Sequence, residues 1–157
     1  MRTAIIAAIA LLFFCSHANA HEYASNNLSI HHPYAYEVKK LGNMTWAFMH
    51  ITNNGEEDDK LIGASSPIAG SIDIMDGDTK VDEVDIDSNR SVKLKHNGIH
   101  LVLNDIKKTP IRVGARRTIT LKFERAGDVK VDLIFGKIAE VSLCDDGSHS
   151  KKIKPKD

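Results

Sequence analysis

The sequence has few cysteines, no excess of either charge and only one long apolar run, and each scarcity excludes a class of protein. Its 157 residues include 2 cysteines, 21 basic residues and 21 acidic residues. Two cysteines cannot build the disulfide framework that holds many small secreted domains together. A balanced charge without a basic patch excludes the usual binding mode for nucleic acid and for an anionic membrane surface.

The long apolar run lies at the N-terminus and predicts a cleaved secretory signal. Arg2 supplies the positive charge, residues 4–14 form the apolar stretch, and Ala18-Asn19-Ala20 offers small residues for cleavage. The run is shorter than the roughly 20 residues that a membrane-spanning helix needs. We therefore predict a signal peptide over residues 1–20, a mature chain of 157 − 20 = 137 residues, and export without a membrane span.

Signal cleavage would remove one basic residue and one cysteine. Loss of Arg2 leaves 21 − 1 = 20 basic residues against 21 acidic ones, so the mature net charge is close to −1. Loss of Cys15 leaves Cys144 without an intramolecular partner. The Lys-rich end around Cys144 has little apolar content, so we predict a polar, disordered tail over residues 141–157 and a folded domain over 21–140. A tolerated thiol is the favoured reading of Cys144, with metal binding and dimer formation as alternatives.

Between these ends the apolar residues recur with a period of two. Apolar and polar residues alternate over 118–124 and again over 129–135, which predicts two half-buried antiparallel strands. The short break between them contains Gly127 and indicates a hairpin. Similar Gly-containing breaks lie at residues 53–55, 76–78 and 96–98. No stretch after residue 20 has helical spacing, so the pattern predicts an all-β sandwich or barrel.

The stretch from Phe48 to Met75 is central to this prediction. It reads as a strand, an acidic turn, a second strand, a Ser-Ser-Pro break and a third strand. The acidic segment that follows, residues 76–87, suits a solvated edge hairpin because charges on edge strands discourage pairing between sheets.

Four segments resemble, in order, the periplasmic copper chaperone family PCu(A)C. Family members share a His-Pro-aromatic element, an Asn-Asn-Gly turn, a Ser-Ser-Pro-x-Ala-Gly break, a His-x-Met strand and a closing hairpin. The matching segments here are HEYASNNLSIHHPYAYE, WAFMHITNNGEEDDKLIGASSPIAGSIDI, SVKLKHNGIHLVL and RRTITLKFERAGDVKVDLIF. The resemblance implies a cupredoxin-like β-sandwich in the periplasm that carries Cu(I) toward cytochrome oxidase assembly. Its implied partners are the copper ion and an oxidase assembly protein or copper-site subunit.

The copper ligands are where the sequence departs from that family. Family members bind copper through a His after the Ala-Gly strand, methionines in the next hairpin, and the later His-x-Met. Here Met75 stands where the first His belongs, and residues 76–87 contain no methionine. The His-x-Met element has become His100-x-Val102.

Met75 and His100 are therefore the predicted copper ligands. Cu(I) is soft and prefers thioether, thiolate and imidazole donors. Strand alternation places His100 with Val102, and Met75 with Asp73, on faces that point away from the core. Because two ligands are fewer than the family's four, a site built from these alone is expected either to be weaker or to need a third donor. His21 is a candidate, since cleavage would make it N-terminal and its amine and imidazole together chelate copper, preferably Cu(II).

Other soft or nitrogen donors have simpler explanations. We expect His31 and His32 to be a solvated pair, Met49 to lie in the core, and His96 to face solvent in its turn. An outward-facing His100 should contribute little to stability, so His100→Ala is expected to weaken copper binding without unfolding the protein.

The sequence contains no motif of a known catalytic site. It has no Gly-x-Ser-x-Gly elbow, no His-Glu-x-x-His and no phosphate-binding glycine loop. We therefore predict a binding protein and not an enzyme. Two hypotheses remain: a Cu(I) metallochaperone, and a metal-free interaction module that keeps the fold but has lost copper binding.

Overall fold

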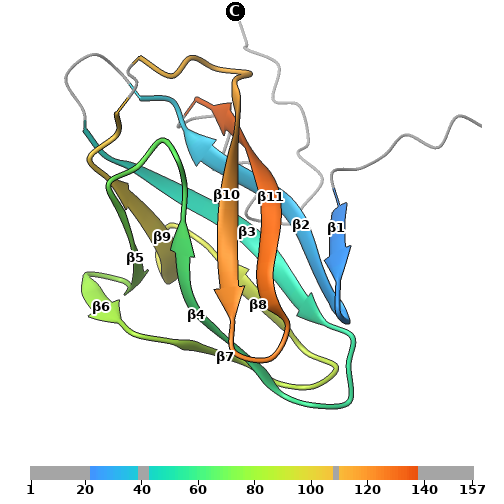
Figure 1. Cartoon of the computed structure of the whole chain (residues 1–157). Coiled ribbons are helices and arrows are strands. Elements are labelled where there is room, and N and C mark those ends of the chain that lie inside the picture. Colours follow the sequence, from blue (N-terminus) through green and yellow to red (C-terminus); the bar gives the residue numbers. More distant parts are fainter. Residues whose placement is uncertain (1–21, 39–42, 108–109, 138–157) are drawn as a thin grey trace, which may run out of the picture.

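The computed structural model describes residues 22–38, 43–107 and 110–137 (Figure 1). The predicted signal peptide (1–20), His21 and the predicted tail (141–157) with Cys144 lie outside these residues. Every regular element of the described part is a β-strand, which confirms the all-β prediction. No helix in these ranges is long and apolar enough to cross a membrane.

Eleven strands form one sheet in the order β6-β5-β9-β3-β2-β11-β10-β4-β7, with β1 added to β2 and β8 added to β3. Their bounds are β1 Glu22–Ser25, β2 Leu28–Tyr36, β3 Thr45–Asn53, β4 Asp59–Ser65, β5 Ser71–Asp76, β6 Thr79–Val81, β7 Val84–Ile86, β8 Ser91–Leu94, β9 Ile99–Asn104, β10 Arg116–Phe123 and β11 Gly127–Gly136.

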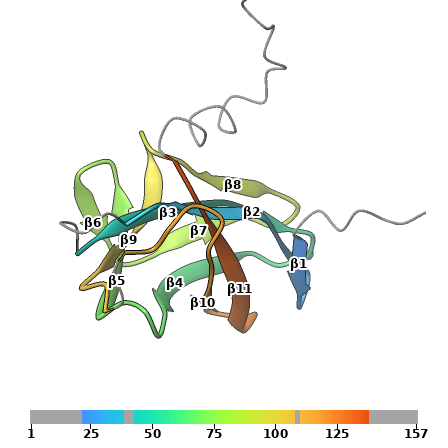
Figure 2. The same cartoon turned by 90° about the horizontal axis from the view of Figure 1, so that it is seen from above.

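The sheet curls into a nearly closed, barrel-like sandwich. Figure 2 shows its two layers, with β2, β3 and β8 in one and β4, β10 and β11 in the other. The described strand pairs are antiparallel except for β2 and β11, which run parallel. Aliphatic side chains from both layers fill the space between them, and we call this set the inner core.

The predicted hairpin is formed by β10 and β11. Residues Ile119 to Phe123 pair with Gly127 to Val131, and every second side chain of both strands is buried in the inner core. Gly127 takes a φ of 74°, a conformation that costs glycine little. The period-two pattern therefore located this pair correctly.

The Ser-Ser-Pro break connects β4 to β5 and fixes the start of β5. The Gly70 amide donates to the carbonyl of Asn104 at 2.9 Å, at the end of β9. A Cβ on Gly70 would lie 2.7 Å from the Cβ of Asp105, which is too close for two carbon atoms. Glycine at this position thus allows the close approach that sets β5 against β9.

The break at residues 96–98 differs from the other three because it does not reverse the chain. β8 and β9 both pair antiparallel with β3, so they are two parts of one interrupted strand. Leu94 faces Met49 and Leu101 faces Ala47, so the chain advances seven residues (101 − 94) where β3 advances two (49 − 47). The surplus forms a loop over residues 95–98, closed by a 2.7 Å hydrogen bond from the Lys95 amide to the Ile99 carbonyl.

Candidate metal site

The sheet face that points away from the inner core carries an aromatic cluster on β2 and β3. Tyr36 and Phe48 are buried, and Tyr34 and Trp46 pack against them half-buried. The ring centroids of Tyr36 and Phe48 lie 5.2 Å apart, and those of Tyr36 and Trp46 lie 5.9 Å apart. We call these four residues the outer aromatic cluster.

Met75 and His100 lie directly opposite each other beside this cluster. They are partners in the antiparallel register of β5 and β9. Their neighbours Ile74 and Leu101 are buried in the inner core, so both side chains project from the outer face. Directly opposed residues have Cβ atoms about 4.5–5.5 Å apart, which brings the thioether and the imidazole within reach of one ion. The structure thus brings together the two ligands named from the sequence.

His100 is buried, which the sequence analysis did not anticipate. Only 7% of the surface of His100 is exposed, and its ring centroid lies 6.3 Å from those of Trp46 and Phe48. The face of the strand was predicted correctly. The expectation that His100 faces solvent was wrong, because aromatic residues from β3 cover this face. Its small contribution to stability stays a prediction, and the burial of the ring argues against it.

A backbone hydrogen bond determines which ring nitrogen of His100 carries the hydrogen. Its Nδ1 lies 2.8 Å from the carbonyl oxygen of Gly98. Because a carbonyl can only accept, Nδ1 must carry the hydrogen, which leaves the lone pair of the neutral ring on Nε2. Nε2 has no hydrogen bond from a described residue, and it is not fully enclosed. Metal-binding histidines are commonly oriented in this way.

The carboxylate next to Met75 on the same face is already engaged. Asp73 accepts a hydrogen bond from Asn104 at 2.8 Å and pairs with Lys80 at 2.6 Å. The hydrogen bond and charge of Asp73 raise the pKa of Lys80 above its ordinary value. Val102, opposite Asp73, is apolar and 7% exposed. Of the side chains on the outer face of β5 and β9, Met75 and His100 are therefore the candidate donors, and Asp73 is not.

The remaining predicted positions are placed as follows. Met49 is buried in the inner core, as expected. His32 is exposed with a φ of 49°, while His31 lies half-buried opposite His50 in the register of β2 and β3. In the described ranges no three side chains among His, Cys, Asp and Glu are grouped to hold a metal.

His96 is exposed, as predicted, but it is not an isolated turn residue. Its ring centroid lies 5.2 Å from that of Trp46 and 6.4 Å from that of Phe48. Sequence reasoning missed this proximity. The available signal was the position of His96, in the break, four residues before His100.

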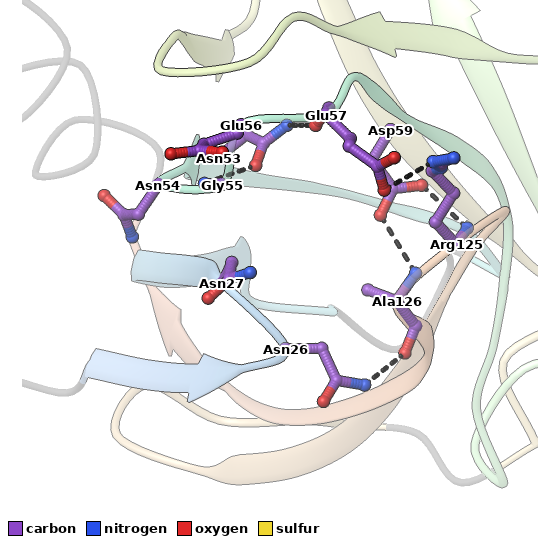
Figure 3. Close-up of a pocket in the computed structure, with 10 residues that line it drawn as sticks. All are labelled: Asn26, Asn27, Asn53, Asn54, Gly55, Glu56, Glu57, Asp59, Arg125 and Ala126. Carbon is purple, nitrogen blue, oxygen red and sulfur yellow. Dashed lines mark hydrogen bonds and ion pairs between the residues drawn. The ribbon is translucent and has the colours of Figure 1, made fainter.

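A separate pocket of about 470 Å³ lies where three turns meet, at the lower end of the molecule in Figure 1. Figure 3 shows its residues, which come from the β1–β2, β3–β4 and β10–β11 turns and the adjoining ends of β3 and β4: Asn26, Asn27, Asn53, Asn54, Gly55, Glu56, Glu57, Asp59, Arg125 and Ala126. None of them is a histidine, cysteine or methionine, so the pocket lacks the soft donors that Cu(I) prefers.

Hydrogen bonds within this pocket join the turns to one another (Figure 3). The buried Asp59 accepts from the backbone amides of Arg125 at 2.9 Å and Ala126 at 3.0 Å. Asn26 donates to the Ala126 carbonyl at 3.0 Å, and Arg125 pairs with Glu57 at 2.7 Å. The arrangement explains how the three turns are held together.

Comparisons with known proteins give one matching family and several similar solved structures. A family model described as "LpqE-like: Putative lipoprotein LpqE-like" matches residues 28–134. No curated protein matches the chain. The solved "Copper-bound PCuAC domain from PmoF2" is 28% identical, with a TM-score of 0.69 over 74% of this chain and 98% of that one. The "Apo PCuAC domain from PmoF1" is also 28% identical, with a TM-score of 0.70 over 74% and 99%.

A third similar structure is the "Solution structure of CuI-DR1885 from Deinococcus Radiodurans". It is 26% identical, with a TM-score of 0.60 over 77% of this chain and 84% of that one. These neighbours confirm the cupredoxin-like fold class, and they are PCuAC domains, as the sequence resemblance suggested. The family model spans 134 − 28 + 1 = 107 of the 157 residues, so the chain belongs to the LpqE-like family.

Proposed function

We propose that this protein is an exported copper-binding metallochaperone that holds Cu(I) between Met75 and His100. The observation that carries the proposal is the direct opposition of these two residues in the register of β5 and β9, with the Nδ1 of His100 fixed by the Gly98 carbonyl. Support also comes from the solved neighbours, whose titles name a copper-bound and a Cu(I)-bound state.

The two ligands suit transfer as well as binding. Thioether and imidazole are the soft and intermediate donors that Cu(I) accepts at low coordination number. Met75 is half-buried and the Nε2 of His100 has no hydrogen bond from a described residue, so a donor from a receiving protein can approach the ion from the outer face. Copper would then leave by stepwise ligand exchange, and it is cargo here and not a catalytic group. No catalytic role is proposed for the protein.

The cellular setting follows from the sequence and the family. A signal peptide over residues 1–20 would deliver a mature domain over 21–140, with the polar tail over 141–157, to the periplasm. The family description as a lipoprotein is compatible with an extracytoplasmic location. By resemblance to PCu(A)C proteins, the recipient would be a cytochrome oxidase assembly protein or the oxidase subunit that holds a copper site.

A competition titration with a chromophoric Cu(I) chelator under reducing conditions tests the proposal. The protein is residues 21–157 carrying Cys144→Ser, which removes the thiol outside the described residues. We expect one ion per chain, with His100→Gln weakening binding by about 100-fold and Met75→Leu by about tenfold. Met49→Leu is the matched control, because Met49 lies in the inner core and should not change the affinity.

The same titration separates the second candidate, a metal-free interaction module. Val102 favours that candidate, since an apolar residue occupies the position where the resemblance expects a methionine ligand. If the Cys144→Ser protein does not bind Cu(I), or if His100→Gln and Met75→Leu bind as tightly as their parent, the metallochaperone proposal is wrong.

A further inference from the structure

The loop over residues 95–98 stands beside the proposed copper ligands. It interrupts the strand that β8 and β9 would otherwise form against β3. Its one donor side chain for a soft ion is the imidazole of His96, which is exposed to solvent.

Two imidazoles meet the same aromatic rings at this place. The His96 ring centroid lies 5.2 Å from that of Trp46 and 6.4 Å from that of Phe48. The His100 ring centroid lies 6.3 Å from both. Since Trp46 and Phe48 project side by side from one face of β3, the two histidines share one patch of the outer aromatic cluster.

The loop is anchored at the end that leads to His100. The Gly98 carbonyl accepts both the Nδ1–H of His100 at 2.8 Å and the amide of Gly77 at 3.2 Å. Gly77 lies in the β5–β6 turn, two residues after Met75. One carbonyl therefore links the loop, the buried ligand and the strand that carries the thioether.

His96 has contacts that orient its ring without occupying its nitrogens. Its interactions with described residues are ring contacts with Tyr36, Trp46 and Phe48. These contacts are tilted or edge-type contacts between rings, and a neutral imidazole keeps a lone pair on one nitrogen that can bind a metal ion.

We propose that His96 is the third copper donor, completing with Met75 and His100 a site of two imidazoles and one thioether. This inference rests on the proposed function and names a ligand that the sequence resemblance does not supply. Three such donors suit Cu(I) better than two. Because His96 is exposed on a loop while His100 is buried on a strand, His96 is also the ligand that a receiving protein would displace first.

The experiment compares two exposed histidines in the 21–157 protein carrying Cys144→Ser. His96→Asn removes the proposed donor, and His32→Asn is the matched control, since His32 is also exposed and asparagine tolerates its positive φ. We expect His96→Asn to weaken Cu(I) binding by about tenfold and His32→Asn to leave it unchanged. Both variants should melt at the parent temperature.

X-ray absorption of the Cu(I)-loaded proteins gives an independent readout of the ligand set. The parent should show one sulfur and two nitrogen neighbours, and His96→Asn should lose one nitrogen while keeping the sulfur. The fluorescence of Trp46, the single tryptophan of the chain, should respond to Cu(I) in the parent and respond less in His96→Asn.

The possible failures are distinguishable. If His96→Asn binds like the parent while His100→Gln loses binding, the His96 inference is overturned and the proposed function stands. If His100→Gln and Met75→Leu also bind like the parent, the proposed function itself is overturned.

Discussion

The polar pocket and the outer aromatic face differ in what their donor atoms already do. In the pocket, Asp59 and Asn26 are hydrogen-bonded across the three turns, and Glu57 is paired with Arg125. On the outer face, the Nε2 of His100 has no bond to any described residue, although the ring is buried. The polar pocket is thus a structural junction, whereas the candidate site lies outside it, on the outer face.

This difference shows that concavity alone is a poor guide to a metal site. A soft ion needs donors of the right type that are oriented and unoccupied. The pocket offers carboxylate and amide oxygens, which are hard donors, and those of Asp59 and Glu57 already join the turns. The outer face offers a thioether and imidazoles held by strand register and by aromatic packing.

The largest expected effect is a loss of stability from a substitution in the polar pocket. Asp59→Ala would leave the amides of Arg125 and Ala126 without their acceptor at 2.9 and 3.0 Å. We expect the free energy of unfolding to fall by about 2–4 kcal/mol, measured by urea denaturation. Cu(I) affinity of the folded protein should not change. A loss of Cu(I) affinity at unchanged stability would instead make the pocket part of the metal site.

A smaller effect is expected from the connection that sets the register of the ligand strands. Gly70→Ala would place a Cβ 2.7 Å from that of Asp105, so we expect about 1–3 kcal/mol of destabilisation and weaker Cu(I) binding, because β5 must shift against β9. Gly63→Ala is the control, since its Cβ would meet only the Cδ of Lys122 at 4.0 Å. Equal unfolding curves for the two variants would contradict this account of Gly70.

The smallest effects on stability are expected from substitutions of the two histidines on the outer face. His100→Ala removes a buried ring that packs against Trp46 and Phe48, so we expect a loss of about 1–2 kcal/mol of stability. His96→Ala, on the exposed loop, should cost less than about 0.5 kcal/mol. Thermal melts of the metal-free proteins would check both values. A neutral His100→Ala would restore the view that this side chain contributes little to the fold.

Sequence patterns located most strands but could not distinguish one kind of turn. The alternation in β10 and β11 and the glycine between them predicted a hairpin, which the register confirms. The break at His96-Asn97-Gly98 looks the same in the sequence as the hairpin breaks. Its different role arises because β3 pairs with the strands on both sides of it, and that pairing depends on residues more than forty positions away.

By itself the sequence determined the all-β fold class, the face on which His100 and Met75 lie, and the resemblance to copper chaperones. Period-two alternation fixes which side chains share a face, so these predictions need only local information. Tertiary structure alone decided that Met75 faces His100, that aromatic residues of β3 cover His100, and that His96 packs against Trp46. Register and burial depend on which distant strands become neighbours. The spacing of residues along one strand does not specify that pairing.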